Sequence, residues 1–290
     1  MQQIVSIEEM RAACGAATSS GRRLGLVPTM GCLHEGHLSL VRRCRAECDL
    51  SAVSIFVNPL QFAPGEDLER YPRDLEGDRA MLFSAGADLL FTPEPSSLYG
   101  PYHAAFVEVG GLTDGMCGSR RPGHFRGVAT IVAKLFNIVR PDAAYFGQKD
   151  WQQAMLISRM VSELDFGIDV VVCPTVRDED GLALSSRNRY LTDSQRRAAP
   201  ALHRALDAAR ARALRGGSSP SELQRIVADE LQANGLDLEY VEVRAARSLR
   251  SAATLDTEEE LVVAAAARLG STRLIDNVLF RTKAGERGTS

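Results

Sequence analysis

Two histidines three positions apart, His34 and His37, are the first residues of the chain whose types and spacing could do chemistry. They follow a short apolar run and lie close to two glycines, in the order Met-Gly-Cys-Leu-His-Glu-Gly-His. If His37 lies in the first turn of a helix, both imidazoles face the same side of the helix N-terminus. That end of a helix favours anions, and Gly31 and Gly36 let a bulky phosphate approach the backbone. The stretch therefore predicts a site for nucleotide phosphates.

Two alternatives remain open at this stretch. A strand, a glycine and a helix often meet without binding anything, so the histidines could be ordinary polar residues at a helix end. A zinc site is less favoured, since two histidines supply only two ligands and the His-Glu-x-x-His spacing of metalloproteases is absent. The stretch alone does not decide between a phosphate site and a structural junction.

A lysine and an aspartate follow another short apolar run, residues 143–146. Lys149 can neutralise a phosphate as a point charge, and Asp150 can accept hydrogen bonds from ribose hydroxyls. A capped helix start with a surface lysine would explain the same residues. Taken together with the histidine stretch, this segment indicates a second phosphate-binding loop.

Two adjacent serines precede an arginine at Ser185, Ser186 and Arg187. Their donors suit a triphosphate, on which charge builds during group transfer. Serines also cap helices, but Thr192 stands closer to the next expected helix and is the better cap. We therefore expect both serines to be available to a ligand.

The polar stretch at residues 61–78 is expected to form a binding loop or a plain surface loop. Its first residue, Gln61, carries an amide beyond the end of an expected strand, where it can donate to and accept from a hydroxy acid. Asp74 and Asp78 lie one helical turn apart and could help to hold Mg2+, although two such carboxylates are more typical of a solvated face. The basic stretch at residues 118–127 could contact an anionic substrate or a partner subunit, or be ordinary surface charge.

The elements that would position these residues alternate between apolar runs and amphipathic segments over the first 176 residues. This pattern predicts an α/β fold with a Rossmann-type, doubly wound parallel sheet, in which ligands bind beyond the carboxyl ends of the strands. Two helical segments and three apolar runs follow, so we expect domains at residues 1–176 and 177–290, the second a smaller α+β domain. The expected strands are residues 24–27, 50–57, 88–91, 106–109, 143–146 and 168–173, then 238–243, 260–266 and 272–280. The expected helices are residues 7–17, 38–48, 75–85 and 128–139, a helix that follows the segment 147–153 and ends near residue 164, then 192–214 and 220–233.

The composition argues against several classes of function. The chain has 290 residues and a formal net charge of -3, which gives no field to hold a nucleic-acid backbone. No apolar run reaches the roughly 18 residues that a membrane-spanning helix needs. The six cysteines form no Cys-x-x-Cys pair and no signal segment opens the chain, so we expect reduced thiols in the cytoplasm. Small phosphorylated ligands fit these properties better than nucleic acid or a membrane.

Four ordered motifs resemble the pantothenate synthetase family. They are Pro-Thr-Met-Gly-x-Leu-His-x-Gly-His at residues 28–37, Phe-Val-Asn-Pro-x-Gln-Phe at 56–62 with Tyr-Pro-Arg at 71–73, Gly-x-Lys-Asp-x-Gln-Gln at 147–153, and Pro-Thr-Val-Arg with Ser-Ser-Arg-Asn between 174 and 188. The resemblance continues more faintly through Thr-Arg-Leu-Ile-Asp-Asn at 272–277. The family belongs to the nucleotidylyl transferases, whose signature is a His-x-Gly-His-like loop at the first helix of a Rossmann-type sheet.

The resemblance implies an ATP-dependent ligase that condenses pantoate with β-alanine. Pantoate would react with ATP to give pantoyl adenylate and pyrophosphate, and the amine of β-alanine would then displace AMP. The resemblance also implies Mg2+ as cofactor, a homodimer, and a C-terminal domain that acts as a lid. Two alternatives remain: another nucleotidylyl transferase that adenylates a phosphate substrate, and a nucleotide sensor without turnover.

The resemblance further implies roles for individual residues. The matching catalytic residues are His34, His37, Lys149, Ser185, Ser186 and Arg187, with His37 as proton donor. The ATP-binding residues would be Met30, Gly31, Cys32, Leu33, His34, Glu35, Gly36, His37, Gly147, Gln148, Lys149, Asp150, Val176, Leu184, Ser185, Ser186 and Arg187. Pantoate would contact Met30, Gln61 and Gln153, and β-alanine would contact Gln61. Asp78 is the expected protein ligand of Mg2+, although some relatives have a second acidic residue where Gly77 stands here.

Overall fold

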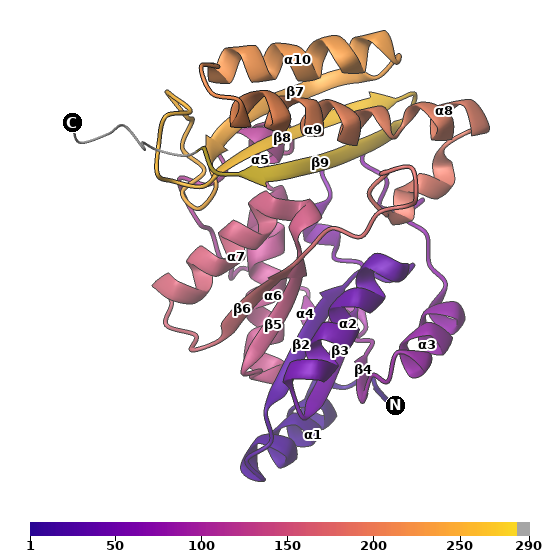
Figure 1. Ribbon diagram of the computed structural model, residues 1–290. Helices are drawn as coiled ribbons and strands as arrows, with labels where there is room; N and C mark the ends of the chain where they lie inside the picture. The colour runs from indigo at the N-terminus through magenta and orange to yellow at the C-terminus, as the bar shows by residue number, and fades with distance from the viewer. Residues whose placement is uncertain (283–290) are drawn as a thin grey trace, which may run out of the picture. The chain divides into compact units, whose positions relative to one another are not determined.

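The computed structural model describes residues 1–282, which divide into two compact units (Figure 1). Unit 1 comprises Met1–Thr113, Arg121–Gln148 and Gln153–Val176. Unit 2 comprises Asp114–Arg120, Lys149–Gln152 and the described residues from Arg177 onward. The chain changes unit after Val176, where the sequence indicated a boundary, but two short segments of the first 176 residues also belong to unit 2.

Unit 1 is built on a sheet of six parallel strands in the order β1-β4-β3-β2-β5-β6. The strands are β1 (Gln2–Ile4), β2 (Leu24–Thr29), β3 (Leu50–Ile55), β4 (Leu89–Phe91), β5 (Ala143–Gly147) and β6 (Asp169–Cys173). Strands β2 and β3 pair over their whole length, from Leu24 opposite Leu50 to Thr29 opposite Ile55. Their apolar side chains are almost fully buried, which is typical of a parallel sheet covered on both faces.

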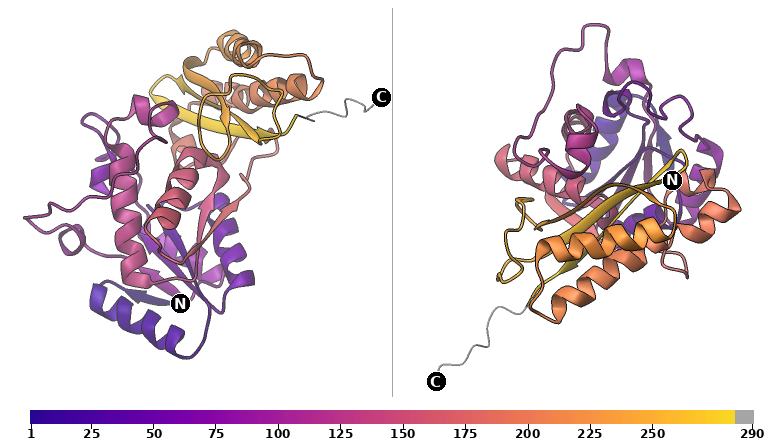
Figure 2. Two further views of the ribbon diagram at one scale, coloured as in Figure 1. Left: turned by 90° about the vertical axis from the view of Figure 1, so that its left-hand side faces the viewer. Right: turned by 90° about the horizontal axis from the view of Figure 1, so that it is seen from above.

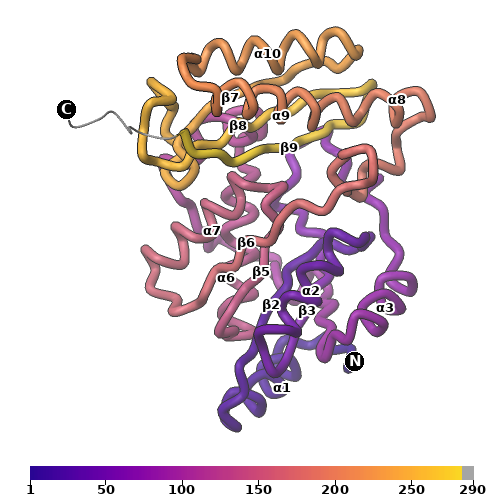
Figure 3. Tube along the Cα trace, viewed as in Figure 1, coloured from indigo at the N-terminus to yellow at the C-terminus, as the bar shows by residue number. Residues whose placement is uncertain are grey.

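Helices cover this sheet. They are α1 (Ile7–Ser19), α2 (Glu35–Glu47), α3 (Leu75–Ser84), α4 (Pro95–Leu98), α6 (His124–Val139) and α7 (Trp151–Glu163), with the 3-10 helix η1 (Pro59–Gln61). Figure 3 shows α2 lying along β2 and β3, where its residues Leu40, Val41 and Cys44 are buried. A Cβ at Gly25 of β2 would collide with the sulfur of Cys44, so the glycine lets the helix come close to the strand. Helices α1 and α6 contact each other and also β2.

The order in which the chain adds strands to the sheet reverses between β2 and β5. From β2 the chain moves outward through β3 and β4, whereas β5 lies on the other side of β2 and leads to β6. Ligands of open α/β sheets bind beyond the carboxyl ends of the strands at such a switch point. Thr29 ends β2 and Gly147 ends β5, so the histidine loop and the turn after Gly147 both begin there.

Unit 2 is a three-stranded antiparallel sheet with helices packed along it (Figures 1 and 2). Its strands are β7 (Asp237–Ala245), β8 (Leu261–Leu269) and β9 (Thr272–Phe280), in that order. Its helices are α5 (Met116–Arg120), α8 (Asp193–Ala198), α9 (Ala201–Leu214) and α10 (Pro220–Ala233), with the 3-10 helix η3 (Ser186–Tyr190). The helices α9 and α10 lie side by side, and Leu206 and Leu223 belong to the same buried cluster as Val263 and Val278. Strand β9 is an edge strand that contacts both α9 and η3.

The structure confirms the expected parallel α/β sheet and the smaller α+β unit, but it corrects some elements. The expected strand at residues 106–109 is wrong, because this stretch is a loop. Arg126 lies over the Phe106 ring, 4.1 Å from its centroid, and the N–H of Val107 donates to Thr130 Oγ1 at 3.0 Å. The apolar residues of the loop therefore pack beside α6 rather than pairing with a strand.

Several other elements also differ from the expectation. Strand β1 was not expected, and only Ile4 of its three residues is buried. The expected helix at residues 192–214 is two helices, because Pro200 has no N–H to continue the ladder of α8. Helix α6 begins at His124, four residues before the expected start. Among the described residues, no helix combines the length and apolar character needed to cross a membrane.

Candidate active site

His34 and His37 fix each other at the start of α2. His34 is the N-cap, and its Nδ1 accepts from the N–H of Gly36 at 3.2 Å. The Nδ1 of His37, in the first turn, accepts from the N–H of His34 at 3.3 Å. The ring centroids are 4.1 Å apart, which confirms that both imidazoles lie on one side of the helix start. Since each Nδ1 is an acceptor, a neutral ring carries its proton on Nε2 and donates from that atom.

The backbone N–H groups of the same loop donate to acceptors within the protein. The loop passes through left-handed conformations at Gly31 (φ +80) and Cys32 (φ 50). The N–H groups of Cys32 and Leu33 donate to the two carboxylate oxygens of Asp78, at 2.8 and 2.7 Å. The N–H of Gly31 donates to Thr29 Oγ1 at 3.2 Å. We expect from the sequence that this backbone binds a phosphate, but in the structure the carboxylate of Asp78 occupies the concave turn. The groups of the loop that we assign to a phosphate are therefore the imidazoles.

Asp78 thus holds the backbone of this loop, and its expected role as a Mg2+ ligand stays a prediction. It lies in the first turn of α3 with only 1% of its surface exposed. A Cβ at Gly31 would lie 2.9 Å from Asp78 Oδ2, so this close approach requires glycine. Asp74, the other carboxylate of the expected pair, is the N-cap of α3 and accepts from the N–H of Gly77 at 3.0 Å. Within residues 1–282, no group of three His, Cys, Asp or Glu side chains could hold a metal ion.

The structure brings Gln61 and Met30 together. Gln61 ends η1, is 8% exposed, and its Nε2 lies 2.9 Å from Met30 Sδ. Asn58 donates from Nδ2 to Gln61 Oε1 at 3.1 Å and to the carbonyl of Gly127 at 3.0 Å. The hydroxyl of Tyr99 donates to Asn58 Oδ1 at 2.8 Å, and burial raises the pKa of this tyrosine so that it stays protonated. The Gln61 amide is therefore fixed, with its NH2 toward the histidine loop.

A partly buried ion pair holds the backbone of Gln61. Arg121 donates to both oxygens of Glu66, each at 2.7 Å, and its Nη1 lies 3.0 Å from His124 Nε2. The carbonyl oxygen of Gln61 lies 2.8 Å from His124 Nδ1 and accepts from Arg121 Nη2 at 3.3 Å. Burial raises the pKa of Glu66, but the hydrogen bonds and charge of Arg121 outweigh it and hold the pKa below its usual value. In the structure, the basic stretch thus supplies two residues that position Gln61.

The remaining expected residues of unit 1 follow the strands of the sheet. Gly147 and Gln148 come at the carboxyl end of β5, beside the switch point, and are half-buried. Gln153 is half-buried in the first turn of α7, and Val176 follows β6 as the last residue of the unit. All four therefore lie at or after the ends of strands β5 and β6.

Lys149 begins a short segment that is anchored in unit 2. Its carbonyl oxygen accepts from Asn277 Nδ2 at 3.0 Å. Two residues later, Trp151 Nε1 donates to the carbonyl of Ala246 at 2.8 Å. These contacts explain why residues 149–152 belong to unit 2, whereas the rest of α7 belongs to unit 1. Further anchors are the bonds of Gln152 to the carbonyl of Gly115 and the N–H of Cys117, both at 2.9 Å.

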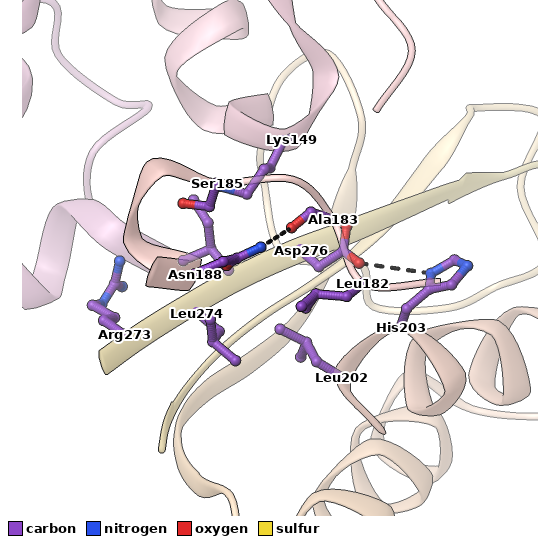
Figure 4. A pocket seen from close by; sticks show the side chains of 11 residues that line it. Lys149, Leu182, Ala183, Ser185, Asn188, Leu202, His203, Arg273, Leu274 and Asp276 are labelled. Atoms are coloured by element: carbon purple, nitrogen blue, oxygen red, sulfur yellow. Dashed lines mark hydrogen bonds and ion pairs between the residues drawn. The ribbon is translucent and has the colours of Figure 1, made fainter. Parts of the chain in front are cut away.

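The serine segment lies beside Lys149 at the edge of β9 (Figure 4). Lys149 and Ser185 line the same cavity of about 10 Å3. Ser185 is the N-cap of η3, since its Oγ accepts from the N–H of Arg187 at 3.3 Å. Ser186 is 8% exposed. Ser185 thus caps η3 although Thr192 was expected to be the cap in this region, and it also lines the cavity; the availability of both serines to a ligand stays a prediction.

His203, which belongs to none of the sequence motifs, lies on α9 between two carboxylates. Its Nδ1 is 3.6 Å from Asp276 Oδ2 (Figure 4). Its Nε2 is 3.6 Å from Asp207 Oδ2. Burial and the nearby Arg177 guanidinium lower its pKa more than the two carboxylates raise it. The ring is therefore uncharged at neutral pH.

Comparison with known proteins agrees with this arrangement. A family model described as pantoate-beta-alanine ligase matches residues 2–279. The pantothenate synthetase of Moorella thermoacetica is 49% identical over 281 residues, covering 97% of this chain and 99% of the relative. That of Pseudomonas fluorescens (strain SBW25) is 48% identical over 280 residues, covering 96% of this chain and 98% of the relative.

Solved structures agree over the same length. The crystal structure of pantothenate synthetase from Thermus thermophilus has a TM-score of 0.88 at 46% identity, covering 96% of this chain and 99% of that one. A pantoate-beta-alanine ligase from Francisella tularensis, described as complexed with beta-gamma ATP and beta-alanine, has a TM-score of 0.79 at 33% identity. It covers 96% of this chain and 97% of that one.

Proposed function

The chain belongs to the pantoate–β-alanine ligase family, and on this premise we propose how its residues join pantoate to β-alanine with ATP. A carboxylate oxygen of pantoate attacks the α-phosphorus of ATP, and pyrophosphate leaves. The product is pantoyl adenylate. The amine of β-alanine then attacks the acyl carbon, the bond to the AMP oxygen breaks, and the amine loses a proton. The protein contributes mainly positioning and charge stabilisation, because phosphoryl-type transfer needs little covalent help.

The observation that carries this proposal is the reciprocal contact between His34 and His37. Both Nδ1 atoms accept from the backbone, so both rings present Nε2–H donors at a helix N-terminus where an anion is already favoured. We assign both rings to the phosphates of ATP and assign proton donation to His37. The rest of the loop, Met30, Gly31, Cys32, Leu33, Glu35 and Gly36, completes the ATP-binding segment.

Lys149, Ser185 and Arg187 supply further donors to the triphosphate in this proposal. A lysine neutralises phosphate as a point charge, and an arginine adds a planar set of donors. In support, Lys149 and Ser185 lie close together on the lining of one small cavity, which places both donors near the same point. The proposal keeps the lid role of residues 177–290. The other residues assigned to ATP are Gly147, Gln148, Asp150, Val176, Leu184 and Ser186.

Gln61 is assigned to pantoate and β-alanine, with Met30 and Gln153 also contacting pantoate. The fixed amide of Gln61 can donate to one oxygen of a hydroxy acid and accept from another. Its contact with Met30 supports a substrate position next to the histidine loop. An amide suits a hydroxyl and a carboxylate better than a phosphoester, which favours this reaction over adenylation of a phosphate substrate.

Mg2+ is proposed to enter with ATP. Its preferred ligands are oxygens, and it keeps several waters when it binds nucleotide phosphates. Among the described residues no group of three His, Cys, Asp or Glu side chains could hold the ion, and both oxygens of Asp78 already accept backbone N–H groups. We therefore assign the ion to phosphate oxygens and water, and no catalytic step to Asp78. Activity titrated with Mg2+ in Asp78→Asn protein should retain the wild-type dependence on the ion.

AMP formation tests the proposed reaction directly. The protein is incubated with ATP and Mg2+, with pantoate, β-alanine or both. We expect pantothenate and stoichiometric AMP only when both substrates are present. A pyrophosphate-forming reaction without AMP would favour the rival that adenylates a phosphate, and nucleotide binding without turnover would favour a sensor.

A homodimer in the cytoplasm completes the proposal. The family resemblance supports the dimer, and six buried cysteine thiols fit a reducing compartment. Light scattering after gel filtration tests the first point, and fractionation of cells that express the chain tests the second. A monomer at micromolar concentration would contradict the dimer.

A further inference from the structure

We propose that Asp276 and Asn277, neighbours on β9, are positioning residues for the adenylation step, an inference that rests on the proposed function. Asp276 holds the hairpin that leads to Ser185, and Asn277 holds the backbone of Lys149. Neither side chain contacts substrate in this assignment. Their effect on the reaction therefore passes entirely through other residues.

Asp276 fixes the hairpin before the serine segment. Its carboxylate is 3% exposed and accepts from Arg177 Nη1 at 2.6 Å and from Nη2 at 2.9 Å. The same guanidinium donates to the carbonyl of Gly181 at 3.1 Å, so it spans the turn of the hairpin. The N–H of Asp178 donates to the carbonyl of Leu182 at 2.9 Å and closes the hairpin. The planar arginine therefore ties the turn before Ser185 to β9.

Asn277 fixes Lys149. Its side chain is 2% exposed, and its Nδ2 donates to the carbonyl of Lys149 at 3.0 Å. Its own N–H donates to Asp276 Oδ1 at 2.8 Å, which links the two anchors. Because this bond holds the backbone of Lys149 itself, the Cα and Cβ of the lysine are fixed. The ammonium group at the end of the side chain can still adjust.

The two anchors share a rigid strand but point to opposite sides of the sheet. In β9, Asp276 pairs with Ala265 and Asn277 with Ala264, in a register that continues without a bulge from Thr272 to Phe280. Successive strand residues face opposite sides, and Asp276 lies on the side of α9, next to His203. Because the two anchors are adjacent in β9, the strand fixes the distance between the backbone of Lys149 and the hairpin that precedes Ser185. Such a fixed separation is what preorganised binding of a triphosphate requires.

The buried ion pair also fits a positioning role better than a stabilising one. Removing two charges from water costs energy that their attraction only partly restores, so buried pairs add little to stability. A bidentate pair does impose one geometry on the groups that it joins. We therefore expect the pair of Arg177 and Asp276 to affect rate more than folding.

The first test separates the two half-reactions in Asn277→Ala protein. We expect pantoate-dependent exchange of pyrophosphate into ATP to fall about tenfold. Release of AMP from synthetic pantoyl adenylate and β-alanine, which needs no triphosphate contact, should stay within about twofold of wild type. The matched control is Asn234→Ala, which removes a similar 2.8 Å bond from an asparagine amide to the carbonyl of Glu230 in the same unit. This control should leave both half-reactions unchanged.

Equal losses in both half-reactions, or no loss in either, would overturn the positioning role of Asn277. If the alanine variant does not fold, Asn277→Asp keeps the shape and removes the donor, and the same result is expected. Wild-type protein without pantoate-dependent exchange would contradict the proposed function itself. An active wild type with an unaffected variant contradicts only this inference.

The second test is a double-mutant cycle with Lys149→Ala. A residue that acts through Lys149 has nothing to position once that side chain is gone, so we expect Lys149→Ala/Asn277→Ala to be no slower than Lys149→Ala alone. The control pair Lys149→Ala/Asn234→Ala should likewise match Lys149→Ala. A further loss of about tenfold in the first pair would mean that Asn277 acts independently of Lys149.

The third test addresses Asp276. Asp276→Asn leaves Arg177 buried without its charge partner, so it should lower both stability and exchange rate. Arg177→Met/Asp276→Leu removes both charges and should recover most of the thermal stability while exchange remains about tenfold slow. Recovery of the rate together with stability would overturn the positioning role.

Discussion

The histidine loop of unit 1 and the lysine and serine segments of unit 2 are held in opposite ways. The loop is held mainly by its own neighbours, with His34 and His37 capping one helix and a single remote carboxylate, Asp78, closing the turn. Lys149 is bonded to Asn277 of β9, and the hairpin that precedes Ser185 is bonded to Asp276 of the same strand through Arg177. The proposed phosphate contacts therefore depend on local helix capping in unit 1 and on a strand distant in sequence in unit 2.

Removing one donor from each region should give the largest effect and tests whether both are needed. We expect His37→Ala and Lys149→Ala each to lower kcat for AMP formation by about 100-fold or more, because each side chain acts on charge that develops during transfer. Steady-state assays at saturating ATP and pantoate measure this. Near-normal turnover in either variant would show that the residue has no role in the mechanism. The region that contains it would then not be a phosphate-binding region.

Asp78→Ala should have the next largest effect, since it leaves two backbone N–H groups of the loop without their acceptor. We expect a loss of about 3 kcal/mol in the free energy of unfolding of unit 1, and a raised KM for ATP. Urea denaturation and initial rates measure the two quantities. The control Asp74→Ala removes a carboxylate cap from the same helix and should cost about 1 kcal/mol without changing KM. Similar kinetic effects in both variants would mean that Asp78 does not hold the ATP loop.

Gln61→Ala tests whether, within unit 1, pantoate and ATP are bound by different residues. Loss of a hydrogen bond worth about 1.4 kcal/mol raises KM for pantoate about tenfold. The KM for ATP should change by less than about twofold, because His34 and His37 remain in place. Initial rates with each substrate varied in turn provide the measurement. Equal weakening of both substrates would show that Gln61 is not selective for pantoate.

The smallest expected effect is the pH dependence of the contact between Glu66 and Arg121. The folded-state pKa of Glu66 lies below its usual value, so its stabilising contribution is present above the unfolded pKa, near pH 4.3, and is lost as pH falls through the folded pKa. The Tm difference between wild type and Glu66→Gln should be of the order of 2 °C at neutral pH and shrink below about pH 4. A difference that is constant down to about pH 3 would contradict the assigned contact.

Local signals in the sequence predicted much of the fold and the position of the histidines. The apolar run before Pro28, followed by glycine and an amphipathic stretch, predicted β2 and α2, and the spacing of the histidines predicted their common side. Thr192 was expected to cap the next helix, and it caps α8 in a capping box with Gln195. These features depend on residues within one or two turns, which a sequence displays directly.

Contacts over long separations could not be predicted in the same way. Asp78 lies 45 and 46 residues from the N–H groups that it binds, and no local pattern distinguishes it from Asp74. The link from Asn277 to Lys149 spans 128 residues. The stretch 106–109 was expected to be a strand, but it is a loop in which Arg126 of α6 lies over the Phe106 ring. In each case the local sequence is compatible with two structures, and tertiary packing determines which of them forms.

Transfer of an oxygen atom tests the central claim, attack of the pantoate carboxylate on the α-phosphorus, most directly. Pantoate labelled with heavy oxygen in both carboxylate positions is converted with ATP and β-alanine, and the AMP is weighed by mass spectrometry. If pantoyl adenylate forms and β-alanine breaks its bond between the acyl carbon and oxygen, AMP carries one labelled oxygen from pantoate. Unlabelled AMP accompanying labelled pantothenate would contradict the account.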